Sequence, residues 1–348
     1  MLPIREAVRS MAGYVPGEQL NDPDIVKLNT NENPYPPSPR VFEAVRAALT
    51  GDRLRKYPQP LGDDFRRAAG RVLNVDPDAI LIGNGSDDIL TVLTRAFVPE
   101  GGLVLAPTPS YVLYKSLAEI QGARFETVPF TPDWQLPQAW PTGGNVTFLP
   151  NPNSPSGTVV SLAEVERLAA AIAPAPLVLD EAYADFADDN GLSLLGRVPN
   201  LIVTRTLSKS YALAGIRFGF AVAAPAVVRE LVKVKDSYNC DVLSLAAATA
   251  AIEDQDYFLA TRDRIIATRG RLAAALSALG FDVTPSQANF LWCRRADRPV
   301  KPLYEELKRR RVLVRTMNYA GYDGLRITVG SDAETDRLLS ELRSILRG

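Results

Sequence analysis

Residues 201–219 read LIVTRTLSKSYALAGIRFG. Their apolar start is typical of a buried strand, which leads Lys209 into a turn of small hydroxylated residues. A lysine becomes a nucleophile toward carbonyl carbon when its surroundings lower its pKa, and the product is a Schiff base. Ser208 and Arg217 are groups that bind phosphate. The stretch indicates a reactive lysine beside an anion site, although a Ser-Lys-Ser tripeptide by itself is most often an exposed polar turn.

A second apolar run, at residues 176–179, ends in Asp180-Glu181-Ala182-Tyr183. Such a run is typical of a buried parallel strand, and open α/β sheets bind ligands at the carboxyl ends of these strands. Pyridoxal phosphate needs a carboxylate there, because its ring accepts electrons only while the pyridine nitrogen is protonated. Asp180 is the candidate carboxylate, and Tyr183 could reach the phenolic oxygen of the cofactor. An isolated aspartate after a strand is more often a helix cap, but the combination of Asp180 with Lys209 favours a role in binding the cofactor.

A third apolar run is followed by Asn84-Gly85-Ser86, where a helical pattern begins. Helix N-termini present unpaired N–H groups and a positive partial charge to phosphate, and Gly85 lets the backbone approach a ligand closely. A serine-capped helix after a tight turn is the plain alternative. In combination with Lys209, the pattern favours a phosphate site that Ser208 and Arg217 complete.

Composition and charge exclude several classes of protein. The 348 residues exceed one ordinary domain, and a hydrophobic content of 46% supports a sizeable core. A formal net charge of −1 gives no reason to expect nucleic acid or a membrane surface as a partner. The chain has no histidine, which excludes Ser-His-Asp and Cys-His catalysis and histidine-based metal sites, so we expect no metal. Proton transfer near neutral pH is then expected from a lysine.

Two features favour a cytoplasmic location. Cys240 and Cys293 lack metal-site spacing and suggest no disulfide framework, so we expect reduced and packed cysteines. The first residues contain no apolar stretch typical of a signal peptide, and no apolar run is long enough to cross a bilayer.

Apolar runs alternate with helical patterns from about residue 55 to residue 245, which predicts a mostly parallel sheet with crossover helices. Ser161 and Glu164 form a capping box at the start of one helix. Seven strands are expected, at residues 80–82, 103–106, 124–128, 146–149 and 218–222 and in the two runs that lead to Asp180 and Lys209.

Beyond about residue 246, the pattern changes to long helices. Strands are expected there at residues 290–293, 312–314 and 325–329, which predicts a small α+β domain. The expected organisation is an N-terminal arm over residues 1–39, a large cofactor-binding α/β domain over residues 40–245, and a small α+β domain over residues 246–348 that packs with the arm.

Together these segments resemble the fold-type I, class II pyridoxal-phosphate-dependent aminotransferases, and among them the histidinol-phosphate aminotransferase family. The similar segments are LNTNENPY at residues 28–35, RKYP at 55–58, IGNGSD at 82–87, PTPSY at 107–111, NPNSPSG at 151–157 and the two that carry Asp180 and Lys209. The resemblance as a whole extends from Tyr14 to Gly330 and so covers nearly the whole chain. The resemblance implies a large domain with a mostly parallel seven-stranded sheet, a smaller α+β domain, and pyridoxal 5'-phosphate held by Lys209 as a Schiff base.

The resemblance implies roles for further residues. Tyr111 stacks on the pyridine ring, where an aromatic adds about 0.5–1.5 kcal/mol beyond burial. Asn153 and Tyr183 hydrogen-bond the phenolic oxygen. Tyr57 reaches the cofactor phosphate of a partner subunit, which makes the protein a homodimer with shared active sites. Without the family, Tyr111 would be a packed loop tyrosine, Asn153 a turn residue and Tyr57 a residue of extended chain.

Arg326 is a charged residue in an apolar run, residues 325–329. Its position in the family implies that it faces the substrate, and a guanidinium can hold either a carboxylate or a phosphate with two hydrogen bonds. Arg315 and Tyr14 are candidates for a second anion contact. Half-buried strands also carry outward arginines, and residues 316–324 match no pattern that would fix the substrate.

The implied reaction is transamination of L-histidinol phosphate with 2-oxoglutarate, which gives imidazole acetol phosphate and L-glutamate in histidine biosynthesis. The partners would then be a small-molecule amino donor and a 2-oxo acid. An aromatic amino acid aminotransferase and a threonine-phosphate decarboxylase of the same fold are alternatives. A non-catalytic pyridoxal-binding regulator is disfavoured because the sequence shows no basic DNA-binding segment. A Rossmann-type nucleotide binder would show G-x-G-x-x-G after its first strand, which this sequence lacks.

Overall fold

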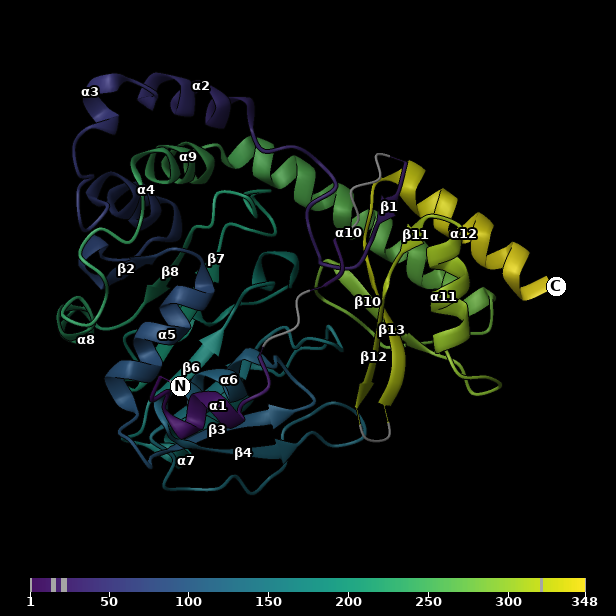
Figure 1. The fold of residues 1–348 in the computed structure, drawn as a ribbon, viewed down its shortest axis with the longest axis horizontal. Coiled ribbons are helices and arrows are strands. Elements are labelled where there is room, and N and C mark those ends of the chain that lie inside the picture. The colour runs from purple at the N-terminus through teal and green to yellow at the C-terminus, as the bar shows by residue number, and fades with distance from the viewer. Residues whose placement is uncertain (1, 14–16, 20–23, 320–321, 348) are drawn as a thin grey trace.

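The computed structural model describes residues 2–13, 17–19, 24–319 and 322–347 (Figure 1). The main feature of the fold is a seven-stranded sheet in the order β2-β8-β7-β6-β5-β3-β4. The strands are β2 (Ile80–Gly83), β3 (Leu103–Thr108), β4 (Arg124–Pro129), β5 (Val146–Pro150), β6 (Leu177–Asp180), β7 (Leu201–Thr206) and β8 (Gly219–Val222). Only β8 runs antiparallel to its neighbours, and the other pairs are parallel. The predicted sheet and its seven strands are confirmed.

The central strands are continuous apolar runs because helices cover both faces of the sheet. Leu179 of β6 packs into the core on the side of α7 (Leu162–Ile172). Its neighbour Val178 packs into the core on the side of α5 (Ser86–Phe97) and α6 (Leu113–Gln121). Successive side chains of a strand point to opposite faces, so a strand covered on both sides needs an apolar residue at every position.

Helix α7 begins where the capping box predicts. The hydroxyl of Ser161 accepts a hydrogen bond from the backbone N–H of Glu164 at 3.2 Å. That bond pairs one of the amide groups that the first turn of a helix leaves without a partner.

A group of helices lies beyond the end of the sheet formed by β2 and β8 (Figure 1). These helices are α2 (Pro39–Ala48), α3 (Gly51–Leu54), α4 (Asp63–Leu73), α8 (Pro225–Leu231) and α9 (Val242–Glu253). Of these, α4 and α8 contact β2, α9 packs on α4, and α2 packs on α9. Phe65 of α4 packs edge-on against Phe218 and Phe220, with ring centroids 4.6 and 5.4 Å apart. Three short 3-10 helices connect other elements: η1 (Pro77–Ala79), η2 (Ala184–Phe186) and η3 (Gly191–Leu194).

The C-terminal part of the chain forms a separate antiparallel sheet in the order β12-β13-β10-β9. Its strands are β9 (Asp282–Val283), β10 (Phe290–Arg294), β12 (Arg315–Tyr319) and β13 (Tyr322–Thr328). The helices of this part are α10 (Gln255–Ala278), α11 (Lys301–Arg309) and α12 (Asp332–Arg347). This smaller α+β unit agrees with the predicted fold class.

The N-terminal segment joins the C-terminal part of the chain. A short helix, α1 (Glu6–Ser10), precedes β1 (Val26–Lys27), which pairs in parallel with β11 (Val312–Leu313). The exact domain borders at residues 39/40 and 245/246 stay a prediction. Among the helices of the described residues, none has the length and apolar character needed to cross a membrane.

Candidate active site

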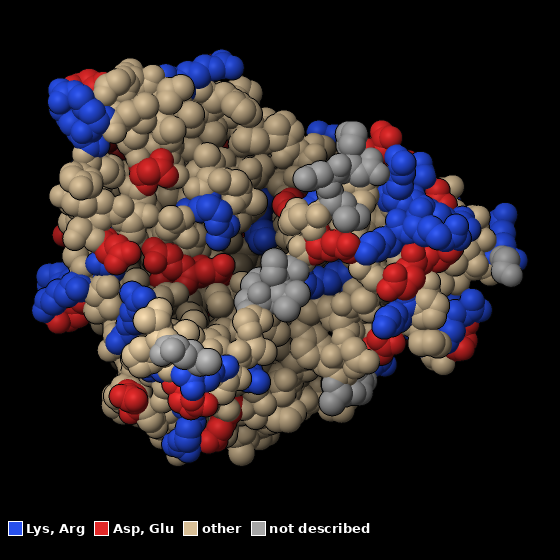
Figure 2. Space-filling view, viewed as in Figure 1, with Lys and Arg blue, Asp and Glu red and all other residues tan. Residues whose placement is uncertain are grey.

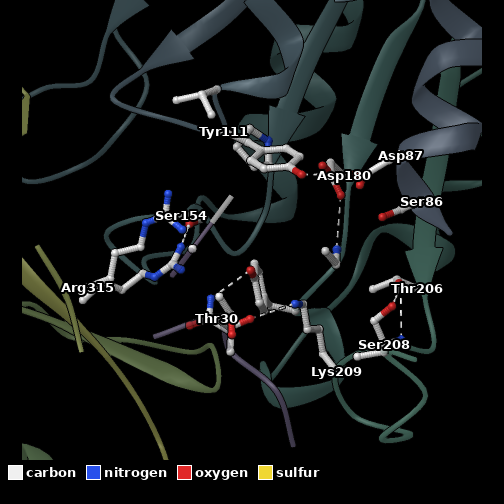
Figure 3. Close-up of a pocket in the computed structure, with 18 of the residues that line it drawn as sticks. Thr30, Ser86, Asp87, Tyr111, Ser154, Asp180, Thr206, Ser208, Lys209 and Arg315 are labelled. Carbon is white, nitrogen blue, oxygen red and sulfur yellow. Dashed lines mark hydrogen bonds between the residues drawn. The ribbon is translucent and has the colours of Figure 1, made fainter. Parts of the chain in front are cut away.

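A cavity of about 340 Å³ lies where the carboxyl ends of β3, β5, β6 and β7 face the four-stranded sheet (Figure 3). Figure 2 shows the surface hollowed between these two parts of the molecule, with acidic and basic side chains beside the hollow. Nine of the residues predicted from the sequence line the cavity: Ser86, Tyr111, Asp180, Tyr183, Ser208, Lys209, Arg217, Arg315 and Arg326. Residues from six segments of the chain thus meet at the edge where α/β sheets bind ligands.

Lys209 lies in the turn after β7, and its amine points into the cavity (Figure 3). The amine donates a 3.3 Å hydrogen bond to the backbone oxygen of Thr30 and lies 5.9 Å from the ring centroid of Tyr183. The side-chain amide of Asn33 donates to the backbone oxygens of Lys209 and Ser210 at 3.1 and 2.9 Å. The N-terminal segment therefore holds the turn that presents the lysine.

Asp180 is the last residue of β6 and is almost completely buried at the cavity wall. Its Oδ2 accepts a 2.7 Å hydrogen bond from the hydroxyl of Tyr114. Its Oδ1 accepts longer bonds from the hydroxyl of Thr204 at 3.4 Å and the backbone N–H of Ala182 at 3.3 Å. Burial raises the pKa of Asp180 to about 6, and the hydrogen bond from Tyr114 opposes that rise.

Two tyrosines predicted to contact a cofactor face the cavity. The hydroxyl of Tyr183 accepts a 3.0 Å hydrogen bond from the side-chain amide of Asn31. The hydroxyl of Tyr111 donates to Oδ1 of Asp87 at 3.1 Å. Both hydroxyls are held by residues to which the sequence analysis gave no role, Asn31 and Asp87.

Asn153 is buried close to the cavity but does not line it. Its amide nitrogen donates to the backbone oxygen of Pro109 at 3.2 Å and to the hydroxyl of Ser156 at 2.9 Å. Both of its N–H groups are therefore used within the protein, and its contact with a cofactor stays a prediction.

Hydroxyl and N–H groups gather at the start of α5. Ser86 is the first residue of that helix, and Thr206 and Ser208 come from the end of β7 and the turn after it (Figure 3). Arg217 donates to the hydroxyl of Ser208 at 3.4 Å, and its guanidinium lies 3.7 Å from the carboxylate of Asp87. Such a set of donors at a helix N-terminus is suited to a doubly charged anion.

Two glycines make this end of the cavity possible. Gly85 adopts φ +87°, and a Cβ there would lie 2.7 Å from the guanidinium of Arg217. A Cβ on Gly219 of β8 would lie 2.5 Å from the backbone nitrogen of Ser86. The side chain of Asn84 is exposed, and neither Asn84 nor Gly85 lines the cavity, so their contacts with a ligand stay predictions.

Two arginines lie at the opposite side of the cavity from Ser86 and Ser208, and Figure 3 labels one of them, Arg315. Arg315 of β12 and Arg326 of β13 are directly opposite each other in the antiparallel pair and therefore share one face of the sheet. Arg326 is only 8% exposed, so the alternative of an outward-pointing strand arginine is wrong.

Hydrogen bonds fix the side chain of Arg326. It donates to the hydroxyl of Ser154 at 3.0 Å and to the backbone oxygen of Asn29 at 3.1 Å. These bonds connect the four-stranded sheet, the loop after β5 and the N-terminal segment at the cavity wall.

Tyr57 does not belong to this cavity in a single chain. Its side chain is 80% exposed and stacks on Tyr238 with ring centroids 4.4 Å apart. The role of Tyr57 in a partner subunit stays a prediction. Tyr14, the other candidate for an anion contact, lies outside the described residues.

Several cavity residues were given no role from the sequence, although most of them lie in the segments that resemble the family. Among them are Thr30, Asn31, Glu32, Asp87, Ser154, Thr206, Met317 and Tyr319. A signal for the last two existed, since Arg315, Met317 and Tyr319 alternate along β12 and alternate residues of a strand share a face. The others lie in loops or at element ends, where no periodic pattern marks the direction of a side chain.

The seven-stranded sheet, the smaller α+β unit and a lysine and an aspartate at the carboxyl ends of adjacent strands define a fold-type I transferase. Residues 23–342 match the family model described as aminotransferase class I and II. The chain belongs to this aminotransferase family.

Named relatives match over almost their full length. The chain is 51% identical over 339 residues to a histidinol-phosphate aminotransferase of Rhodopirellula baltica, covering 95% of this chain and 92% of the relative. It is 46% identical over 353 residues to the enzyme of that name from Geobacter sulfurreducens, covering 99% of this chain and all of the relative. A crystal structure of histidinol-phosphate aminotransferase from Sinorhizobium meliloti in complex with pyridoxal-5'-phosphate matches with a TM-score of 0.88 and 27% identity, covering 100% of this chain and 98% of that one.

Proposed function

We propose that the chain catalyses transamination of L-histidinol phosphate with 2-oxoglutarate, as a pyridoxal-phosphate-dependent enzyme of histidine biosynthesis. The observation that carries the proposal is the cavity, where Lys209 and Asp180 lie at one side and Arg315 and Arg326 at the other. The relatives of 51% and 46% identity carry the histidinol-phosphate aminotransferase name. Their names favour this reaction over an aromatic aminotransferase or a threonine-phosphate decarboxylase.

The residues present fit pyridoxal phosphate. A carboxylate for a ring nitrogen, an amine for an aldehyde carbon and a group of donors for a phosphate all face one cavity, as Asp180, Lys209 and Ser86 with its neighbours. Gly85 leaves room that a Cβ would fill, next to Arg217. Three separate requirements of one small molecule are therefore met within the same space.

The chain's own residues account for binding and proton transfer. Bound pyridoxal phosphate supplies an aldehyde that condenses with amines and a ring that accepts the electrons of a broken bond. Lys209 would hold the aldehyde carbon and, when a substrate amine replaces it, move the proton from the substrate α-carbon. Asp180 would keep a proton on the ring nitrogen, and Tyr111 would cover the ring face.

The two arginines support an anionic amino donor. Histidinol phosphate carries a phosphate and no carboxylate, whereas glutamate carries carboxylates. A guanidinium can bind either group with two hydrogen bonds. Arg326 is our proposed contact for both donors, with Arg315 as the second cation beside it.

A homodimer and a cytoplasmic location complete the proposal. The apolar residues Phe42, Leu49, Leu54 and Tyr57 are exposed on or next to α2 and α3, and a partner subunit would cover them. Tyr57 would then contact the cofactor phosphate of that partner. Cys240 and Cys293 are buried free cysteines, which supports a reducing compartment.

The test is a set of kcat/KM values for the protein loaded with pyridoxal phosphate. L-histidinol phosphate, L-phenylalanine and L-threonine phosphate are compared as substrates, with 2-oxoglutarate as acceptor. We expect histidinol phosphate to be preferred and Lys209→Ala to lower turnover at least about a thousandfold. Lys233→Ala, which removes an exposed lysine paired with Glu230, is the matched control. A preference for phenylalanine, or release of carbon dioxide from threonine phosphate, would contradict the proposal.

A further inference from the structure

Tyr114 lies in the first turns of α6 and has no exposed surface. Its hydroxyl donates the 2.7 Å hydrogen bond to Oδ2 of Asp180, the shortest contact of that carboxylate. Tyr111, three residues earlier, lines the cavity, whereas Tyr114 does not. Tyr114 therefore reaches Asp180 through the protein interior and not from the space that a substrate would occupy.

The ring of Tyr114 is fixed by two other rings. It stacks on Phe148 of β5 with centroids 4.8 Å apart and an interplanar angle of 6°. It also meets Tyr111 edge-on at 5.6 Å and 87°. Because the ring is completely buried and packs against these two rings, its hydroxyl is held at the carboxylate of Asp180.

The hydroxyl of Tyr114 acts as a donor toward the ionised carboxylate of Asp180. Burial, and then the negative charge of Asp180, raise the pKa of Tyr114 well above its ordinary value. The phenol therefore keeps its proton while Asp180 is ionised, and the hydroxyl is then the donor of the bond.

The other groups around Asp180 do not replace this donor. Thr204 of β7 and the backbone N–H of Ala182 give longer bonds, at 3.4 and 3.3 Å. Asp87 of α5 is a nearby negative charge that raises the pKa of Asp180. Lys209 lines the same cavity, but its amine bonds to the backbone oxygen of Thr30. Tyr114 is thus the strongest neutral group that favours the ionised form of Asp180 over its protonated form.

We propose that Tyr114 is a positioning residue, whose hydroxyl holds the carboxylate of Asp180 in place and lowers its affinity for a proton. The proton shared with the bound cofactor would then stay on the ring nitrogen, where the electron-accepting ring needs it. The effect on Asp180 is independent of any ligand, and the effect on the ring nitrogen rests on the proposed function.

Tyr114→Phe tests the proposal because it keeps the stacked ring and removes only the oxygen. In the protein without cofactor, carbon-13 NMR of the Asp180 carboxyl group should show a higher titration midpoint than in the wild type. With pyridoxal phosphate labelled at its ring nitrogen, the nitrogen-15 signal should move from the pyridinium position toward that of unprotonated pyridine. The rate of α-proton exchange should fall about tenfold to a hundredfold, with the substrate KM unchanged.

Tyr35→Phe is the matched control. The hydroxyl of Tyr35 is buried and has no hydrogen-bond partner within the described ranges, so this variant removes a phenolic oxygen without a carboxylate beside it. It should leave both NMR signals unchanged. An unchanged Asp180 midpoint in Tyr114→Phe would overturn the proposal, and so would a shifted midpoint with an unchanged ring nitrogen. A protein that bound no pyridoxal phosphate would refute the proposed function, while the titration without cofactor would still decide whether Tyr114 acts on Asp180.

Discussion

Asp180 combines a functional requirement with a cost in stability. Its pKa in the folded protein without cofactor is about 6, against an ordinary value of 3.8, mainly because the carboxyl group is buried. Between these values the folded state binds more protons than the unfolded state, so the free energy of unfolding falls as pH rises through this window. The difference between the two pKa values corresponds to about 3 kcal/mol of unfolding free energy. This is the cost of burying the ionised carboxylate, and it is fully present above pH 6.

Asp180→Asn should remove this dependence. The amide oxygen can still accept the hydrogen bond of Tyr114, and no charge has to be buried. Without cofactor, the wild type should lose stability from about pH 4 to pH 7 while the variant does not. The difference in unfolding free energy between variant and wild type should therefore rise by up to about 3 kcal/mol over this range. The cofactor-loaded variant should keep the cofactor but lose about a hundredfold or more in kcat, because an amide cannot hold the ring proton.

Urea unfolding of both proteins at pH 4 and pH 7 measures the stability difference. Asp189→Asn, which changes an exposed aspartate, serves as the control and should behave as the wild type at both pH values. If the two proteins differ by the same amount at pH 4 and pH 7, the buried carboxylate costs no stability. If kcat is unchanged as well, Asp180 is only a helix cap.

Arg326 offers a second test at the level of a single side chain. Removing one partner of a buried, hydrogen-bonded charge pair costs about 2–5 kcal/mol. Arg326→Ala should therefore lower kcat/KM about 30-fold to several thousandfold for both histidinol phosphate and glutamate. Arg315→Ala should affect donors with a second or doubly charged anionic group more than phenylalanine.

Kinetics with three donors on the wild type and both variants provide the measurement. Arg337→Ala, at an exposed arginine of α12, is the control and should leave all values unchanged. Equal kcat/KM values for Arg326→Ala and the wild type with every donor would show that this arginine binds no substrate.

A buried ion cluster joins the ends of strands β6 and β7 next to the turn that carries Lys209. Arg205 of β7 donates to the carboxylates of Glu181 at 2.7 Å and Asp185 at 2.8 Å. Asp185 also accepts a hydrogen bond from Ser210, the residue after the lysine. The cluster thus connects both strand ends that carry the candidate catalytic residues.

Arg205→Met should destabilise the protein strongly, because it leaves the carboxylate of Glu181 buried without its cation. Breaking a buried pair in this way costs about 3–5 kcal/mol in the free energy of unfolding. Arg205→Met combined with Glu181→Gln should recover part of the loss, since the unpaired charge is gone. Urea unfolding of the wild type and the variants measures both effects.

An exposed ion pair on β4 supplies the comparison. Arg124 and Glu126 lie 3.3 Å apart at the surface, and Arg124→Ala should change the free energy of unfolding by no more than about 0.5 kcal/mol. A loss in Arg205→Met as small as in Arg124→Ala would mean that water or a rearranged side chain compensates the buried carboxylate.

The elements of the large sheet were predictable because each is a local pattern. An apolar run such as residues 177–179 is buried on both faces, and the acid that follows it falls at the ligand edge of the sheet. Lys209 and Ser86 were found in the same way, from their position just after a strand or at a helix start. For these residues, both the type of side chain and its position at the end of a strand or the start of a helix can be read from the sequence.

Other parts of the site depend on contacts between distant segments, which no local pattern contains. Tyr114 is an ordinary helix residue until the fold brings it to Asp180, 66 positions along the chain. Thr30 contributes through its backbone oxygen, so its side chain gave no indication. The residues of β12 are mostly polar and only partly buried. The alternation of Arg315, Met317 and Tyr319 therefore does not appear as a pattern of apolar and polar residues.

At the scale of the whole molecule, the cavity needs three parts of the chain. The seven-stranded sheet supplies Asp180 and Lys209, the four-stranded sheet supplies the arginines, and residues 29–33 of the N-terminal segment bond to both. Helices α2 and α3 lie on the far side of α9 from the seven-stranded sheet (Figure 1). The apolar residues Phe42, Leu49 and Leu54, on or next to these two helices, are exposed. Apolar surface of this kind is typical of a subunit interface.

A shared active site predicts that two variants with defective sites restore activity when mixed. If Tyr57 completes the site of the partner subunit, a heterodimer of a Lys209→Ala chain and a Tyr57→Phe chain contains one site free of both changes. Random exchange of subunits should then restore about a quarter of the wild-type sites, measured as turnover after the two proteins are unfolded together and refolded. Lys209→Ala mixed with Asp180→Asn is the control, because both changes fall in the site of their own chain and every site stays defective. Activity that does not rise above the mean of the parent proteins, or a fully active monomer in sedimentation at high dilution, would show that each chain completes its own site.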